Sequence, residues 1–244
     1  MIPENVRIVS GSEDSIHRER DEDYADYHKR LSSTDQCIQI WKDQQRLFDI
    51  KVPVGIFNPY GGVAAQLFVS GICNGQIDVS GKSIVDLGCG CGIIGLAAIN
   101  AGCRSVLFTD ISHNIQSIME HVLFRPNQDR VAIQDLCINE PRNTYDRVFF
   151  SIPSTLVEHM PEHDTYETGI FRDDSLVERA FSEVSRILVD RGEFYFFYRV
   201  KDEHFLEWME LVRRLGDKFD LNTLRILWHK RESKAHALLA CIEK

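Results

Sequence analysis

Apolar and polar positions alternate in short, sharply bounded runs through the middle of the chain. Residues 83–86 form an almost unbroken apolar run that ends in a carboxylate, which predicts a short buried strand. Residues 93–101 carry apolar side chains on nearly every face, which predicts a buried helix. A second apolar run over 105–109 predicts the next strand. The stretch therefore predicts a strand, a tight turn, a helix and a second strand.

The same pattern extends over the rest of the chain. Helical periodicity alternates with short apolar runs, an order typical of an α/β protein with a doubly wound parallel sheet. The last two strands lie close together in sequence and predict an antiparallel pair. The predicted helices cover 63–73, 115–124, 174–189 and 205–215, and the further strands cover 130–134, 146–150, 193–200, 224–228 and 235–242.

The first 50 residues predict a different kind of structure. After a polar terminus, Tyr24, Tyr27 and Leu31 recur at spacings of three and four, which predicts a helix. A second apolar set that begins at Ile38 and ends at Phe48 is interpreted as another helical piece. We therefore expect an N-terminal helical extension over 1–50 and one α/β domain over 51–244. The extension has two equal interpretations, a lid over a substrate or a plain structural addition.

Three glycines follow the first predicted strand of the central stretch. Gly88, Gly90 and Gly92 let a ligand approach the backbone closely and present N–H groups at the start of a helix. Asp110 follows Gly92 by eighteen residues and ends the neighbouring strand. A carboxylate at that place can accept hydrogen bonds from a ribose. The pattern predicts a cofactor that contains a nucleoside.

The carboxylate before the glycines distinguishes between two such cofactors. Gly90, Gly92 and Gly95 also fit the dinucleotide pattern, but Asp86 would place a negative charge against the pyrophosphate of NAD. A cationic amino-acid group would be favoured there instead. The segment Val-Asp-Leu-Gly-Cys-Gly-Cys-Gly-Ile-Ile-Gly over 85–95 resembles the first motif of class I S-adenosylmethionine (SAM)-dependent methyltransferases.

This resemblance implies a Rossmann-like, seven-stranded, mostly parallel sheet and SAM as the cofactor. It also implies that the region over 51–244 is the SAM-binding catalytic domain. Asp110 would be the ribose-binding acid, and the segment after the third strand would lie beside the adenine. The implied cofactor-binding residues are Asp86, Gly88, Cys89, Gly90, Gly92, Asp110, Ile111, Asp135, Leu136 and Ser151.

The segment after the predicted strand 146–150 corresponds to the reactive loop of this family. Many members carry Asn, Asp or Ser, then two prolines and an aromatic residue. Here Ser151 and Pro153 fit that pattern, whereas Ile152 and Ser154 do not. The missing aromatic removes a stacking surface that a nucleobase or an amide would use. This departure argues against methylation of bases or of glutamine.

Two tyrosines complete the candidate catalytic set with Ser151. Tyr60 follows a Phe-Asn-Pro segment that resembles the lead-in of glutamine methyltransferases, and it could lie with Phe57 near the sulfonium. Tyr166 lies in a charged, histidine-bearing insert over 156–174 that we expect to cover the substrate. The insert has no metal-ligand spacing, so no metal site is predicted.

Composition excludes some partners and compartments. The formal net charge of −9 argues against a protein that binds nucleic acid through basic patches. No apolar run is long enough to predict a membrane span. The seven cysteines match no zinc spacing. We expect reduced thiols and a cytoplasmic location.

Three functions remain open. The first is methyl transfer from SAM to a small molecule held by Ser151, Tyr60 and the insert. The second is a reaction that consumes SAM itself, as in azetidine-2-carboxylate synthases, which release methylthioadenosine. The third is a non-catalytic subunit of the same fold, against which the intact Asp86 and Asp110 argue.

Overall fold

The computed structural model describes residues 5–10, 24–156, 171–172, 175–232 and 234–244. Its main feature is a seven-stranded sheet in which β12 is antiparallel to both of its neighbours and every other neighbouring pair is parallel. The predicted mostly parallel α/β sheet is confirmed. In spatial order the strands are β6 (Arg130–Ile133), β5 (Ser105–Asp110), β4 (Ser83–Leu87), β7 (Tyr145–Ser151), β10 (Leu188–Lys201), β12 (Ala235–Glu243) and β11 (Thr223–Glu232).

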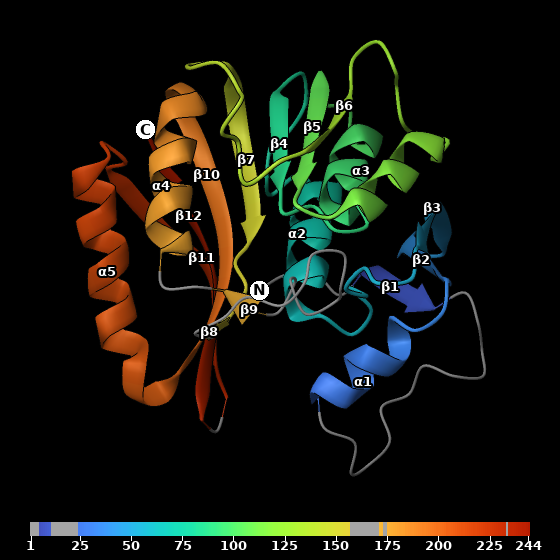
Figure 1. Ribbon diagram of the computed structural model, residues 1–244, viewed down its shortest axis with the longest axis horizontal. Coiled ribbons are helices and arrows are strands. Elements are labelled where there is room, and N and C mark those ends of the chain that lie inside the picture. Colours follow the sequence, from blue (N-terminus) through green and yellow to red (C-terminus); the bar gives the residue numbers. More distant parts are fainter. Residues whose placement is uncertain (1–4, 11–23, 157–170, 173–174, 233) are drawn as a thin grey trace.

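Helices cover both faces of this sheet. One buried cluster joins the sheet to α2 (Val63–Cys73) and α3 (Ile93–Asn100), and a second joins its other face to α4 (Leu176–Ile187) and α5 (Phe205–Lys218). Figure 1 shows α4 and α5 together on the left of the view. The described part of the main domain also contains the 3₁₀ helices η1 (His113–Glu120) and η3 (Asp202–His204).

Strand β4 contributes to both clusters because its side chains alternate between the two faces. Ile84 is buried with α2 and α3, whereas Val85 and Leu87 are buried with α4 and α5. Asp86 lies on the same face as Ile84 and accepts a hydrogen bond from α3. The alternation thus places a carboxylate below the start of that helix.

The N-terminal region is not the helical extension that the sequence predicts. Among its described residues, only α1 (Tyr24–Leu31) is helical, and β1 (Val6–Ser10), β2 (Gln36–Lys42) and β3 (Gln45–Val52) form an antiparallel sheet. The strict alternation of buried Ile38 and Ile40 with less buried neighbours has the period of a strand. Asp43, with a φ of 54°, forms the turn between β2 and β3.

The small sheet is attached directly to the main domain. Ile38, Ile40 and Ile50 belong to the same buried cluster as α2 and α3. The Gln66 side chain donates to the Val6 carbonyl at 2.6 Å and accepts from the Ile8 N–H at 3.3 Å, which fastens β1 to α2. In Figure 1 this sheet and α1 lie at the lower right, away from α4 and α5.

The loop between β6 and β7 replaces a crossover helix. It is held by the buried Glu140, whose carboxylate accepts from the Tyr145 hydroxyl at 2.6 Å and pairs with Arg130 at 3.1 Å. The predicted helix over 115–124 is a 3₁₀ helix that ends at Glu120. Strand β7 is followed by a two-stranded parallel pair, β8 (Thr155–Leu156) and β9 (Phe171–Arg172).

Within the described part of the chain, no helix is long and apolar enough to cross a membrane.

Candidate cofactor site

The register of the parallel strands brings three predicted residues to one edge of the sheet. Leu87 of β4 lies opposite Phe150 of β7 and Thr109 of β5. One residue further along these strands are Gly88, Ser151 and Asp110, which therefore lie at neighbouring carboxyl ends. Open α/β sheets bind their ligands at this edge.

The glycine loop takes backbone conformations that L side chains rarely adopt. Gly90 and Gly92 have φ values of 52° and 77°. A Cβ on Gly92 would lie 2.8 Å from the Ile118 side chain, so this position is closed by packing. Among the described residues, a Cβ on Gly90 would have only Ile56 within 4 Å, at 3.7 Å. The loop is thus closely packed at Gly92 and open at Gly90, where a ligand can approach the backbone.

Asp110 holds the open part of this loop. Its carboxylate accepts hydrogen bonds from the Gly90 N–H and from the Ser112 N–H, each at 3.0 Å. The Gln134 N–H donates to the Asp110 carbonyl at 2.9 Å, so the end of β6 is tied to the same residue. Asp110 is partly exposed. These contacts fix a carboxylate beside Gly90, as expected for a group that accepts ribose hydroxyls.

Asp86 has a different role from Asp110. It is 1% exposed, and its carboxylate accepts from the Gly95 N–H of α3 at 2.8 Å. The pKa of Asp86 is raised from 3.8 to about 8, mainly by burial; the Gly95 hydrogen bond opposes this rise and the Asp110 carboxylate adds to it. Asp86 therefore fastens the loop to α3 from below, and a cationic ligand group nearby would favour its ionised form.

The two cysteines of the loop are packing residues with neutral thiols. Burial raises the pKa of Cys91 to about 12 and raises the pKa of Cys89 well above its ordinary value. The Cys89 N–H donates to the Thr109 carbonyl at 2.9 Å. Cys89, expected to bind the cofactor, thus uses its backbone N–H to join β4 to β5.

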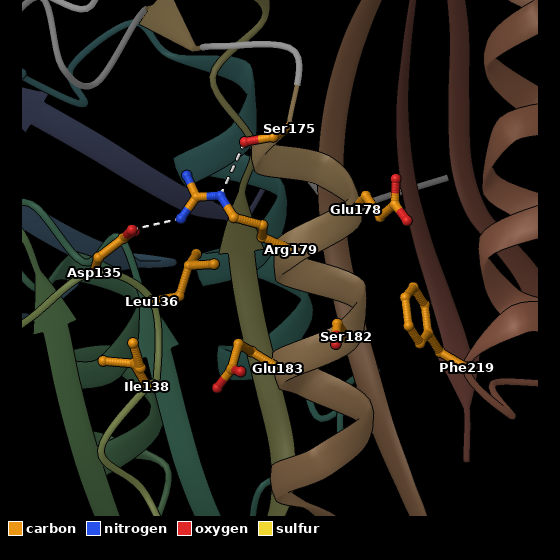
Figure 2. Close-up of a pocket in the computed structure, with 9 residues that line it drawn as sticks. All are labelled: Asp135, Leu136, Ile138, Ser175, Glu178, Arg179, Ser182, Glu183 and Phe219. Carbon is orange, nitrogen blue, oxygen red and sulfur yellow. Dashed lines mark hydrogen bonds and ion pairs between the residues drawn. The ribbon is translucent and has the colours of Figure 1, made fainter.

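A groove of about 330 Å³ lies beside the predicted adenine segment. Figure 2 shows Arg179 of α4 between Asp135 and Ser175. The guanidinium pairs with the Asp135 carboxylate at 2.5 Å, and its Nε donates to the Ser175 hydroxyl at 3.0 Å. The groove shares only its Asp135–Leu136 end with the predicted cofactor site. It is lined by Asp135, Leu136, Ile138, Ser175, Glu178, Arg179, Ser182, Glu183 and Phe219.

Two further predicted residues lie at strand ends on the same edge of the sheet. Ser151 is partly exposed at the end of β7, opposite Phe197 of β10. Ile111 is partly exposed between Asp110 and the buried Ser112. Both are therefore within the region that the register of the strands assigns to the ligand.

Of the two predicted tyrosines, only Tyr60 lies within the described residues. Tyr60 packs against the buried pair Tyr27 and Leu31 of α1, which accounts for its partial burial. Tyr166 and most of the insert lie outside the described residues.

Sequence reasoning missed Asn58. Its side chain is completely buried, its Oδ1 accepts from the Tyr60 N–H at 2.9 Å, and its Nδ2 has no hydrogen-bond partner within the described structure. An Asn before a Pro is an ordinary turn signal. That local signal does not indicate that the side chain is completely buried.

These residues fit a bound SAM molecule. Asp110 would offer a fixed carboxylate to the ribose, and Gly90 leaves room for close approach. Asp135 and Leu136 lie just beyond the end of β6, where the adenine is expected. No group of three His, Cys, Asp or Glu side chains that could hold a metal occurs in the parts of the chain that the structure describes.

Comparison with known proteins agrees with this geometry. Residues 60–149 match the model of a family described as lysine methyltransferases. No curated protein matches the chain by sequence.

Several solved structures share the fold. The ribosomal protein L11 methylase of Lactobacillus delbrueckii subsp. bulgaricus is 17% identical, with a TM-score of 0.51. The match covers 77% of this chain and 82% of the methylase chain. TYW2 of P. horikoshii, in complex with MeSAdo, is 12% identical, with a TM-score of 0.57. The match covers 86% of this chain and 72% of the TYW2 chain. The 16S rRNA methyltransferase RsmC of T. thermophilus, in complex with AdoMet and guanosine, is 16% identical, with a TM-score of 0.54. The match covers 81% of this chain and 42% of the RsmC chain.

At these identities the structures establish the fold alone, and the family match supplies the activity. The resemblance to class I SAM-dependent methyltransferases is confirmed, and so is SAM as the methyl donor.

Proposed function

We propose that this class I SAM-dependent methyltransferase transfers the methyl group to the side-chain amine of a lysine in a protein. The observation that carries the proposal is the match of residues 60–149 to a lysine methyltransferase family. This acceptor takes the place of the small molecule expected from the sequence. A family of transferases also favours methyl transfer over the SAM-consuming cyclisation.

The loop after β7 supports an aliphatic amine as the acceptor. Ile152 and Pro153 are buried, and Ser154 is exposed. The Ile152 N–H donates to the Phe197 carbonyl at 3.0 Å, which fixes the loop against β10. None of the four residues 151–154 offers a flat aromatic surface for a base or an amide. A lysine side chain needs only a narrow path for its aliphatic chain and an acceptor for its amine protons.

Charge supports a cationic substrate. The chain carries 37 acidic and 28 basic residues, excluding histidine, which gives the formal net charge of −9. An acidic protein attracts a lysine-rich partner over long range and raises the rate of encounter. The same charge disfavours an RNA acceptor, because phosphate groups would be repelled.

The chemistry makes modest demands on the side chains of this protein. SAM, when bound, supplies an electrophilic methyl group. A lysine amine has a pKa of about 10.4 and must lose a proton before it can act as a nucleophile. Desolvation beside apolar residues such as Ile152 lowers that pKa. The Ser151 hydroxyl can accept a hydrogen bond from the amine and orient its lone pair, and alignment at about 3–3.5 Å can lower the barrier by roughly 7–11 kcal/mol.

Complete hydrolysis of labelled protein identifies the methylated residue in any acceptor. The purified enzyme is incubated with SAM labelled in its methyl group and with an undermethylated extract. The proteins are then hydrolysed to amino acids. We expect label in methylated lysine, and much less with the Asp110→Ala variant as the control.

Label in methylated glutamine, histidine or arginine would overturn the proposed acceptor. Label in RNA or in small molecules, with none in protein, would also overturn it. Release of methylthioadenosine without any acceptor would restore the cyclisation alternative.

A further inference from the structure

The N-terminal sheet is fastened to the main domain at both of its edges. An edge strand has backbone N–H and C=O groups that no neighbouring strand pairs. At β1, the Gln66 side chain of α2 bonds the Val6 carbonyl and the Ile8 N–H. At β3, the ring of His121 contacts the Asp49 carbonyl, with 2.5 Å between Nε2 and the oxygen. Two side chains from different parts of the main domain thus bind the two edges of one small sheet.

The His121 ring uses both of its nitrogen atoms. The Leu123 N–H donates to Nδ1 at 3.0 Å, so Nδ1 carries the lone pair and Nε2 carries the hydrogen. Nε2 is therefore the donor to the Asp49 carbonyl. The ring also packs edge-on against the buried Phe48, with 6.2 Å between the centroids. One neutral tautomer thus joins the turn after η1 to strand β3.

The backbone of His121 connects this joint to the glycine loop. His121 is the C-cap residue of η1, and its N–H donates to the Ile118 carbonyl at 3.0 Å. The Ile118 side chain lies 2.8 Å from the position that a Cβ on Gly92 would take. At the other end of η1, the Ser112 N–H donates to the Asp110 carboxylate at 3.0 Å. Helix η1 therefore packs against the glycine loop and is bonded to the acid expected to bind the ribose.

We propose that His121 is a positioning residue of the cofactor site, because it links the N-terminal sheet to η1 and thereby couples docking of that sheet to SAM binding. When the link is broken, η1 loses its attachment to Asp49, and Ile118 is held less firmly against the glycine loop. This role differs from both interpretations of the sequence, a lid and a plain structural addition. The inference rests on SAM as the methyl donor and is independent of the acceptor.

Two substitutions test the hydrogen bond between His121 and β3. His121→Gln keeps an N–H group that can donate to the Asp49 carbonyl, whereas His121→Leu removes the donor at similar volume. Calorimetric titration of the whole chain with S-adenosylhomocysteine measures the affinity. We expect His121→Leu to lower the affinity about threefold to tenfold, and His121→Gln to stay within about twofold of the wild type.

Hydrogen exchange of the β3 amides tests the coupling from the opposite direction. Coupling between two sites is reciprocal, so the ligand must stabilise docking of the sheet by the same factor. Saturating S-adenosylhomocysteine should slow exchange over residues 45–52 of the wild type by about threefold to tenfold more than exchange in α5. Figure 1 shows α5 on the opposite side of the molecule from β3, so α5 reports the general stabilisation by the ligand. In His121→Leu this difference between β3 and α5 should disappear.

The matched control is Gln66→Leu. Gln66 fastens the same sheet at its other edge, to α2 and not to η1. The variant should therefore speed up exchange in β1 but leave the affinity for S-adenosylhomocysteine within about twofold of the wild type. If His121→Leu does not fold, the wild-type exchange and the His121→Gln affinity still decide the question, because both have a required result.

Equal losses of affinity in Gln66→Leu and His121→Leu would overturn the proposal, because the sheet would then only stabilise the domain as a whole. It would also be overturned by unchanged affinity in His121→Leu, by a loss of more than about fivefold in His121→Gln, or by wild-type β3 exchange that the ligand slows no more than exchange in α5. Because these experiments contain no acceptor, their outcome is separate from that of the lysine test.

Discussion

The cofactor site has a buried floor and a partly exposed rim, and the two are built differently. The floor comprises Asp86, Gly95 and the side chains of β5 below them. The rim comprises Asp110, Asp135 and Ser151. Asp86 is 1% exposed and bonded to the Gly95 N–H, whereas Asp110 is partly exposed and bonded to the open part of the glycine loop. We infer that the two carboxylates, on neighbouring strands, have different roles: Asp86 holds the loop together, and Asp110 faces the ligand.

Floor substitutions are expected to change folding, and rim substitutions to change binding or turnover. The largest effect on stability is expected at Gly95. A Cβ there would lie 2.8 Å from Cζ of Phe108 and 2.9 Å from Cγ1 of Val106, both buried in β5. Gly95→Ala should lower the free energy of unfolding by about 1–3 kcal/mol in urea denaturation, because the core cannot make room. A change below about 0.5 kcal/mol would show that the floor is not tightly packed.

The next effect concerns pH. Because the pKa of Asp86 rises from 3.8 to about 8 on folding, the folded protein binds the proton more tightly than the unfolded chain. The resulting contribution to stability is fully present below the unfolded pKa. It is lost as pH rises toward and through the folded pKa, by at most about 1.4 kcal/mol per pH unit.

Asp86→Asn removes this titration. The stability of the variant relative to the wild type should therefore increase as pH rises from about 5 to 8 and then level off. Urea denaturation without ligand at a series of pH values measures the difference. A difference that does not change with pH would mean that Asp86 is not a protonated floor residue.

A smaller effect is expected at Ser151 on the rim. Ser151→Ala removes one hydroxyl at a partly exposed strand end, next to Gly88 in the register of β4 and β7. We expect turnover to fall by up to about tenfold, with SAM affinity within about twofold and stability nearly unchanged. Single-turnover kinetics and calorimetry separate the two quantities. Equal losses of turnover and affinity would mean that Ser151 serves only the cofactor.

The smallest effect is expected at the Arg179–Asp135 pair. The two side chains are 40% and 53% exposed, and exposed ion pairs contribute about 0–1 kcal/mol. Arg179→Met should therefore change SAM affinity less than about fivefold in calorimetric titration. A loss of more than about tenfold would show that Arg179 positions Asp135 for the adenine, and that α4 belongs to the rim.

The core of the fold could be predicted because local pattern and tertiary environment agree there. Three local features indicate the same structure for different physical reasons. The apolar run of β4 favours burial, the glycines after it permit a tight turn, and the carboxylate that ends β5 favours a polar strand end. Helix α2 has the predicted bounds, Val63–Cys73, because all of its buried residues except Ser70 are apolar or glycine. Register then places Gly88, Ser151 and Asp110 at neighbouring strand ends without further assumptions.

The N-terminal region shows where local pattern was misleading. Ile38 and Trp41 are three residues apart, as in a helix, but Ile38 and Ile40 are the buried pair. A strand and a helix share such short apolar sets, and only pairing with β1 and β3 decides between them. The ion pair of Arg179 with Asp135, 44 residues away in sequence, also depends on tertiary structure, so it could not be predicted.

The most direct test of the division between floor and rim is the affinity of Asp110→Ala for SAM, measured by calorimetry together with its thermal unfolding. Hydrogen bonds to a charged acceptor contribute about 1.5–3 kcal/mol, so we expect a loss of affinity of about tenfold to a hundredfold with the fold retained. Unchanged SAM affinity in a folded variant would contradict this division, because the cofactor would then not lie against Asp110.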